Sequence, residues 1–138
     1  MSVSPTTKIL LAYRSGDMCA LPECEKNGRR LSIDSVNGDP INQGQAAHIA
    51  GENSGSDKKQ KSARFDPKMT ESERNSYHNL IYLCGACHKR IDTIPQGELD
   101  YPVDRLKAIK AEHEKKVRQA LLDAFSDIGF VELQEATQ

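Results

Sequence analysis

The sequence has no tryptophan and few other aromatic residues, with four tyrosines and three phenylalanines among 138 residues. Its leucine- and isoleucine-rich segments are short, so the chain can build only a modest hydrophobic core. A bound metal ion would add stability to such a core. At this length we expect one domain over residues 1–125, with residues 126–138 forming a tail or a linker to a further C-terminal domain.

The sequence also lacks a long hydrophobic run. No apolar segment approaches the roughly 18 residues of a transmembrane helix, so we expect no contact with a membrane. The first residues, Met1 to Pro5, do not place a basic region before an apolar one, which argues against a secretory signal. Both absences favour a cytoplasmic protein, in a compartment where thiols stay reduced.

The sequence also has no excess of one charge sign. It contains 19 Lys and Arg and 20 Asp and Glu, for a net charge of −1. This balance argues against a protein that coats nucleic acid non-specifically, because such proteins are usually basic. The charges are nevertheless unevenly spread, with an acidic end from Asp123 to Glu135 and a basic cluster in the polar segment from Gly51 to Pro67. Long segments without structure of their own are unusual in compact domains, so we expect a functional loop there. The basic cluster comprises Lys58, Lys59, Lys61 and Arg64.

The four cysteines form two close pairs, one separated by four residues and the other by two. Two short loops that each offer two thiolates are typical of a tetrahedral zinc site. Two disulfides or four buried free thiols are the alternatives. A reducing compartment disfavours the first, and the paired spacing disfavours the second. We therefore expect a closed structural Zn²⁺ site without an open position for a substrate. Its ligands would be Cys19, Cys24, Cys84 and Cys87.

Apolar periodicity and turn residues predict an α+β fold with an N-terminal helix and a long C-terminal helix. The first helix would bury Ile9, Leu10 and Tyr13, and the last would bury a stripe that includes His113. Asn37-Gly38 is a hairpin turn signal between two expected strands. The expected helices span 5–14, 71–77, a segment after Cys87 that closes at 95–97, and 102–125; the expected strands span 30–36, 41–49 and 80–83.

Two histidines stand where packing does not require them. His48 ends an expected strand, and His88 opens a helix with Asp92 four residues later on the same face. A lone histidine is more often structural than catalytic. Together with the cysteine pairs, however, the segments Ala46–Ile49 and Asn79–His88 resemble the HNH endonuclease family. The similarity covers about Cys19 to Asp92.

This resemblance implies a ββα-metal core and a metal-dependent endonuclease that hydrolyses DNA phosphodiester bonds. By position in the family motif, His48 would be the general base, and Asn79 would hold the loop after the first strand and orient His48 by hydrogen bonding. His88 would bind the catalytic divalent ion, with Asp92 as a further ligand. A carboxylate suits Mg²⁺ or Mn²⁺. Many family members carry Asp or His directly before the base, where this chain has Ala47.

Within that family the sequence looks most like one subgroup, the nuclease modules at the N-terminus of bacterial anti-phage (CBASS) effectors. The segments that carry this similarity are Arg14–Gly16, Gln45–Glu52 and Met69–Thr70. In those proteins a SAVED domain follows and senses a cyclic oligonucleotide. The resemblance therefore implies antiviral defence and double-stranded DNA as substrate. DNA phosphates would meet Lys58, Lys59, Lys61, Arg64, Lys89 and Arg90, for which a solvated surface is the alternative.

Two other functions remain open at this point. Ala47 and the acidic balance favour a zinc-stabilised module that only binds DNA or protein. The helix over 102–125 could also pair two copies into a homodimer, although an apolar stripe more often packs within its own chain.

Overall fold

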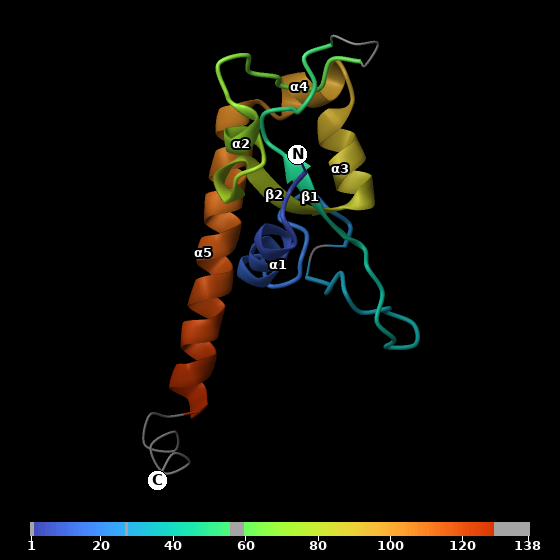
Figure 1. The fold of residues 1–138 in the computed structure, drawn as a ribbon. Helices are drawn as coiled ribbons and strands as arrows, with labels where there is room; N and C mark the ends of the chain where they lie inside the picture. Colours follow the sequence, from blue (N-terminus) through green and yellow to red (C-terminus); the bar gives the residue numbers. More distant parts are fainter. Residues whose placement is uncertain (1, 27, 56–59, 129–138) are drawn as a thin grey trace.

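The computed structural model describes residues 2–26, 28–55 and 60–128, and the polypeptide has a mixed α+β architecture (Figure 1). A small sheet lies at the centre, with helices on both sides and one long helix along the edge. In chain order the elements are α1 Pro5–Arg14, β1 Gly44–His48, α2 Glu71–Arg74, the 3₁₀ turn η1 Tyr77–Asn79, β2 Leu80–Cys84, α3 Gly85–Asp92, α4 Gln96–Asp100 and α5 Val103–Ile128.

The sheet consists of β1 and β2, which pair antiparallel from Gly44 opposite Cys84 to His48 opposite Leu80. Every residue of β2 is buried, as its unbroken apolar run predicts. In β1 only Ala47 is fully covered. Helix α3 begins directly after β2, so the chain runs through two antiparallel strands and then a helix that packs against both.

The expected strand over 30–36 is wrong. That segment makes only an isolated bridge between Ile33 and Pro40, and β1 pairs with β2 instead. The turn itself forms. The Asp34 carboxylate accepts the N–H of Val36 at 2.8 Å, and the backbone N–H of Asp34 donates to the carbonyl of Asp39 at 2.8 Å. Leu31 at the start of the segment is buried in the core, but Ile33 is 39% and Val36 is 93% exposed, so alternation alone does not produce a longer strand.

The two outer helices also differ from expectation. In α1 the buried residue is Leu11, whereas Ile9, Leu10 and Tyr13 are exposed. Helix α5 packs through its first half, where Leu106 and Lys110 are buried, and its C-terminal half projects past the rest of the protein (Figure 1). It continues to Ile128, so the boundary expected at residues 125 and 126 falls inside a helix. Residues 129–138 of the expected tail lie outside the described residues.

Helix α3 ends at Asp92, and the Pro95–Gly97 segment starts a separate helix, α4. Gly97 is required there because a Cβ atom would lie 2.5 Å from the carbonyl oxygen of Ile91. The short helix expected over 71–77 is split into α2 and η1, and the predicted capping box between Thr70 and Glu73 is present. Within the described part of the chain, no helix has both the length and the apolar content to cross a membrane.

Candidate functional site

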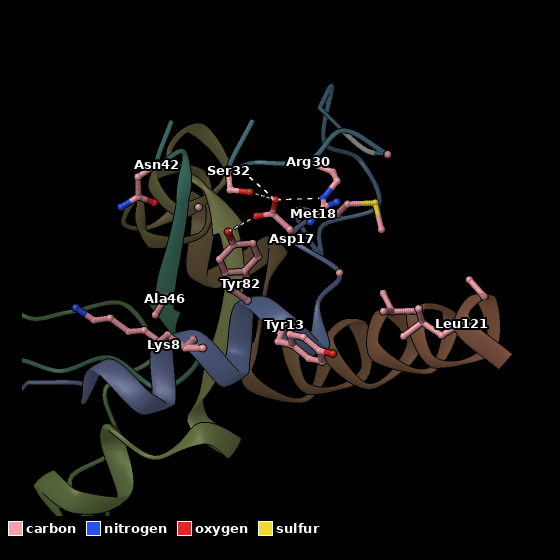
Figure 2. A pocket seen from close by; sticks show the side chains of 17 residues that line it. Lys8, Tyr13, Asp17, Met18, Arg30, Ser32, Asn42, Ala46, Tyr82 and Leu121 are labelled. Carbon is pink, nitrogen blue, oxygen red and sulfur yellow. Dashed lines mark hydrogen bonds and ion pairs between the residues drawn. The ribbon is translucent and has the colours of Figure 1, made fainter. Parts of the chain in front are cut away.

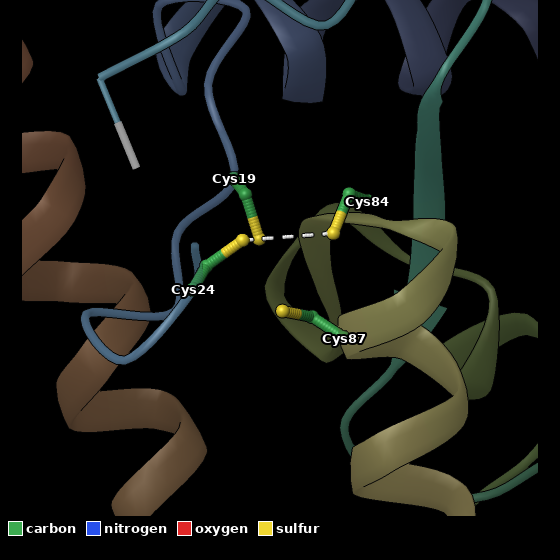
Figure 3. Close-up of side chains that lie close together, drawn as sticks. All are labelled: Cys19, Cys24, Cys84 and Cys87. Carbon is green, nitrogen blue, oxygen red and sulfur yellow. Dashed lines mark hydrogen bonds between the residues drawn. The ribbon is translucent and has the colours of Figure 1, made fainter. Parts of the chain in front are cut away.

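The four cysteines converge although two of them lie sixty residues from the others. Their sulfur atoms all lie within 4.8 Å of one another, and all four side chains are buried (Figure 3). The Sγ atoms of Cys24 and Cys84 are 3.6 Å apart. Sulfurs bound at 2.3 Å around a tetrahedral zinc are separated by about 3.8 Å, so the cluster has the dimensions of such a site. The predicted grouping of the four cysteines is confirmed, and the cluster could hold a metal ion such as zinc.

Local structure explains how the cluster assembles. The loop after α1 is joined to β2 by the Ala20 N–H, which donates to the carbonyl of Tyr82 at 3.0 Å. Cys84 is the N-cap of α3 and Cys87 lies in its first turn. The partial positive charge at a helix N-terminus favours thiolates there.

Burial opposes ionisation of the Cys19, Cys84 and Cys87 thiols. Burial raises the pKa of Cys19 to about 12, and it raises the pKa of Cys87 far above the usual thiol range. Burial opposes ionisation of Cys84 too, but hydrogen bonds from the Cys87 backbone and from neighbouring thiols outweigh it and lower the pKa of Cys84. A divalent ion would supply the positive charge that several thiolates need in this buried position.

His88 and Asp92 lie together on α3, as their spacing predicts. The Nε2 atom of His88 is 3.1 Å from Oδ2 of Asp92, and its Nδ1 atom lies 2.7 Å from Oε1 of Gln45 on β1. Because an amide oxygen only accepts, Nδ1–H donates to Gln45 and Nε2 faces the carboxylate. Two ligand atoms at right angles around Mg²⁺ are about 3 Å apart, so this pair fits part of an octahedral shell.

Within residues 2–26, 28–55 and 60–128, no third His, Cys, Asp or Glu ligand joins the pair. Among the described residues, only the cysteine cluster brings three or more His, Cys, Asp or Glu ligand atoms together. Ala47, which takes the place of the further ligand in the family motif, is fully buried. Any ion at His88 and Asp92 would therefore complete its shell with water or substrate oxygens.

Asn79 holds the loop after β1, but it does so through the backbone. Its Oδ1 accepts the N–H of Ala50 at 2.9 Å, and its Nδ2 donates to the carbonyls of Ala50 at 3.0 Å and Arg74 at 2.9 Å. The expected direct hydrogen bond from Asn79 to His48 is absent. The imidazole of His48 instead meets Asn75, whose Oδ1 lies 2.9 Å from Nε2.

Arg64 is not free to contact DNA phosphates, contrary to expectation. Its side chain is 3% exposed and lies inside the protein. The guanidinium donates to the carbonyls of Ile49 at 2.6 Å, Ile91 at 2.5 Å and His48 at 3.4 Å. It also forms an ion pair of 2.9 Å with Asp92. Arg64 therefore joins the end of β1 to the end of α3.

The other residues expected at DNA fall into three groups. Lys61 is exposed and borders a polar hollow of about 350 Å³ that Asp92 also lines. Lys89 and Arg90 are exposed on α3, and the pKa of Arg90 is raised chiefly by the neighbouring Cys87. Lys58 and Lys59 lie outside the described residues.

A larger hollow of about 910 Å³ lies elsewhere, between α1, the C-terminal half of α5 and the face of the sheet that carries Ala46 and Tyr82 (Figure 2). One wall is held by Asp17, which accepts the Tyr82 hydroxyl at 3.0 Å and pairs with Arg30 at 3.4 Å. The lining contains none of the residues expected at the catalytic centre. Sequence reasoning missed this hollow because its walls come from five separate segments of the chain.

A scan against protein-family models and a search of curated proteins both find no match to this chain. Function is therefore inferred from the residues and the geometry of the site.

Proposed function

We propose that the chain is a metal-dependent HNH-type DNA endonuclease, with β1, β2 and α3 as its ββα-metal core. The observation that carries the proposal is the bridge made by Arg64. Its guanidinium contacts the carbonyl of His48 and the carboxylate of Asp92, and Asp92 contacts His88. The backbone that bears the proposed base is thereby tied to the pair that would bind the ion.

In this proposal the imidazole of His48 accepts a proton from water as the water oxygen attacks phosphorus. The P–O bond to the 3′ oxygen breaks and that oxygen takes a proton from solvent water, which leaves a 3′ hydroxyl and a 5′ phosphate. A Mg²⁺ or Mn²⁺ ion held by His88 and Asp92 would stabilise negative charge on the phosphate and the leaving oxygen. Asn79 keeps the loop after His48 in place through its bonds to Ala50.

The cysteine cluster has a supporting role, as a Zn²⁺ site that fixes where α3 starts. Cys87 immediately precedes His88, so a clamp on the sulfur limits movement of the imidazole. The exposed cations Lys61 and Lys89 remain as candidates for contact with DNA phosphates, together with Lys58, Lys59 and Arg90. Arg64 has a structural role in this scheme.

The test substitutes His48, the proposed general base. We expect His48→Ala to lower Mg²⁺- or Mn²⁺-dependent nicking of plasmid DNA by about 10²- to 10⁴-fold, the usual contribution of a general base. His78→Ala is the matched control, because His78 is exposed and belongs to η1. Zinc content and melting temperature establish that both variants are folded. Undiminished nicking by His48→Ala removes the proposed base, and no metal-dependent cleavage by the wild type removes the proposed enzyme.

A zinc-stabilised binding module is the second candidate. It is favoured by the absence of a third ligand among the described residues and by the pairing of Asp92 with Arg64. Titration with Mg²⁺ and Mn²⁺ separates the two. The binding module would retain DNA or a protein partner in a gel-shift assay while plasmid DNA stays intact at every metal concentration.

On the resemblance to anti-phage effectors, we further propose a cellular setting for the nuclease. The chain would be the cytoplasmic effector module of a bacterial defence protein. In the full-length protein, a sensor domain for a cyclic oligonucleotide would follow α5.

A further inference from the structure

The environment of His48 determines which of its ring nitrogens carries a proton. Its side chain is 17% exposed, and Nε2 lies 2.9 Å from Oδ1 of Asn75. An amide oxygen accepts and cannot donate, so Nε2 must carry the hydrogen of this bond. The carboxylate of Glu52 lies 3.9 Å from Nδ1, which is beyond hydrogen-bond distance. In the neutral ring, Nδ1 therefore keeps its lone pair.

Asn75 is itself held in place by the surrounding backbone. It is the C-cap of α2, and its N–H donates to the carbonyl of Glu71 at 3.2 Å. The carbonyl of the preceding residue, Arg74, accepts from the buried amide of Asn79. The same amide binds Ala50, two residues beyond His48. Asn79 therefore fixes the spacing between the segments that carry Asn75 and His48.

We propose that Asn75 is a positioning residue that fixes the Nε2–H tautomer of His48, so that Nδ1 is the atom that accepts a proton from the attacking water. The role of Nδ1 as a proton acceptor rests on the proposed nuclease function. The choice of tautomer does not rest on it, because it follows from the contact between His48 and Asn75 alone.

The experiment compares Asn75→Leu, which keeps the approximate size but removes the acceptor, with Asn75→Asp, which retains an acceptor oxygen. Ser72→Ala, an exposed change in α2, is the control. Long-range ¹H–¹⁵N correlation spectra of the zinc-loaded chain report the tautomer of His48, assigned by loss of its signals in His48→Gln. Steady-state cleavage with Mg²⁺ gives kcat and KM for each variant.

We expect the wild type and Ser72→Ala to show the Nε2–H tautomer, and Asn75→Leu to show a mixture. Cleavage by Asn75→Leu should fall in kcat by about 10- to 100-fold with KM nearly unchanged, as for the loss of a group that orients another. Asn75→Asp should restore the tautomer and most of kcat. A purely structural role would change stability and would not separate the two variants in this way.

Two results would overturn the inference: the Nδ1–H tautomer in the wild type, or an unchanged tautomer and kcat in Asn75→Leu. A wild type that does not cleave DNA but shows the expected tautomer shift in Asn75→Leu removes the nuclease function and leaves the positioning role intact. The two failures are therefore distinguishable.

Discussion

Arg64 shows how much a single side chain contributes to this fold. Its backbone has a φ of 59°, in the left-handed region that non-glycine residues rarely adopt, so the surrounding structure must stabilise it. Burial lowers the pKa of the guanidinium, and the carboxylate of Asp92 opposes that shift. Three backbone carbonyls and one carboxylate surround the group. Arg64 thereby replaces the hydrogen-bond partners that the ends of β1 and α3 would otherwise lack.

We predict that Arg64→Met lowers the free energy of unfolding by about 3 kcal/mol, because buried carbonyls lose their donor and the new side chain cannot replace it. Urea denaturation at pH 7 measures the change. Lys61→Met, three residues earlier on the surface, should stay within about 0.5 kcal/mol of the wild type. Equal losses in both variants would contradict the internal role of Arg64.

At the scale of elements, a partly buried ionic cluster attaches α5 to the rest of the protein. The ammonium of Lys110 lies 2.7 Å from Glu114 and 3.7 Å above the ring of Tyr77. The Tyr77 hydroxyl donates to Glu114 at 2.5 Å, and the guanidinium of Arg14 on α1 lies 5.2 Å from the centroid of the same ring. The cluster joins α5, η1 and α1. Asn79, the last residue of η1, belongs to the candidate site.

Glu114 makes this attachment sensitive to acid. Burial opposes its ionisation, but hydrogen bonds from Lys110 and Tyr77 outweigh burial and lower the pKa of Glu114 below its ordinary value of 4.5. A carboxylate with a depressed pKa stabilises the fold above the unfolded value, and this contribution is lost as pH falls through the folded value. The relevant window therefore lies below pH 4.5.

We predict that Glu114→Gln lowers the free energy of unfolding by about 2 kcal/mol at pH 7, the range for a hydrogen bond to a charged group. The difference from the wild type should shrink as pH is lowered below 4.5, where Glu114 itself becomes neutral. Denaturant midpoints at pH 7 and pH 3 measure this. Glu112→Gln, an exposed change on the same helix, is the control. A difference that stays constant with pH would show that charge is not the cause.

At the scale of the whole molecule, the cysteine cluster connects segments that are far apart in the sequence. The loop after α1 supplies one pair and the junction of β2 with α3 supplies the other. A metal ion there would close a long stretch of chain, including β1 and the polar segment after it. Because the core is small and β1 is only partly covered, this closure should provide a large share of the stability.

We predict that the purified chain contains one zinc ion, and that Cys87→Ser lowers the zinc content and reduces Tm by at least about 10 °C, since several kcal/mol are lost. Ala86→Ser, an exposed neighbour in α3, is the control. Atomic absorption and thermal unfolding monitored by circular dichroism measure the two effects. Full stability of the wild type after removal of metal by a strong chelator would mean that the cluster holds no structural ion.

A feature could be predicted from the sequence where adjacent residues specify it. The cysteine pairs, the Thr70–Glu73 capping box and the buried strand expected over 80–83 are specified by adjacent residues. Each is present, and the strand extends to Cys84. Apolar periodicity was a weaker guide. In α1 it selected Ile9 and Tyr13, which are exposed, because periodicity does not reveal which face has a partner.

What the amino-acid sequence determined by itself was the composition of the site: which thiols could share an ion, and which imidazoles and carboxylates lie at the ends of elements. Only the tertiary structure decided how those groups are held. Gln45, Arg64 and Asn75 orient them through contacts with residues 16 to 43 positions away. Such contacts depend on how β1, α2 and α3 pack, and a single polar side chain carries no periodic pattern that could reveal its partner in advance.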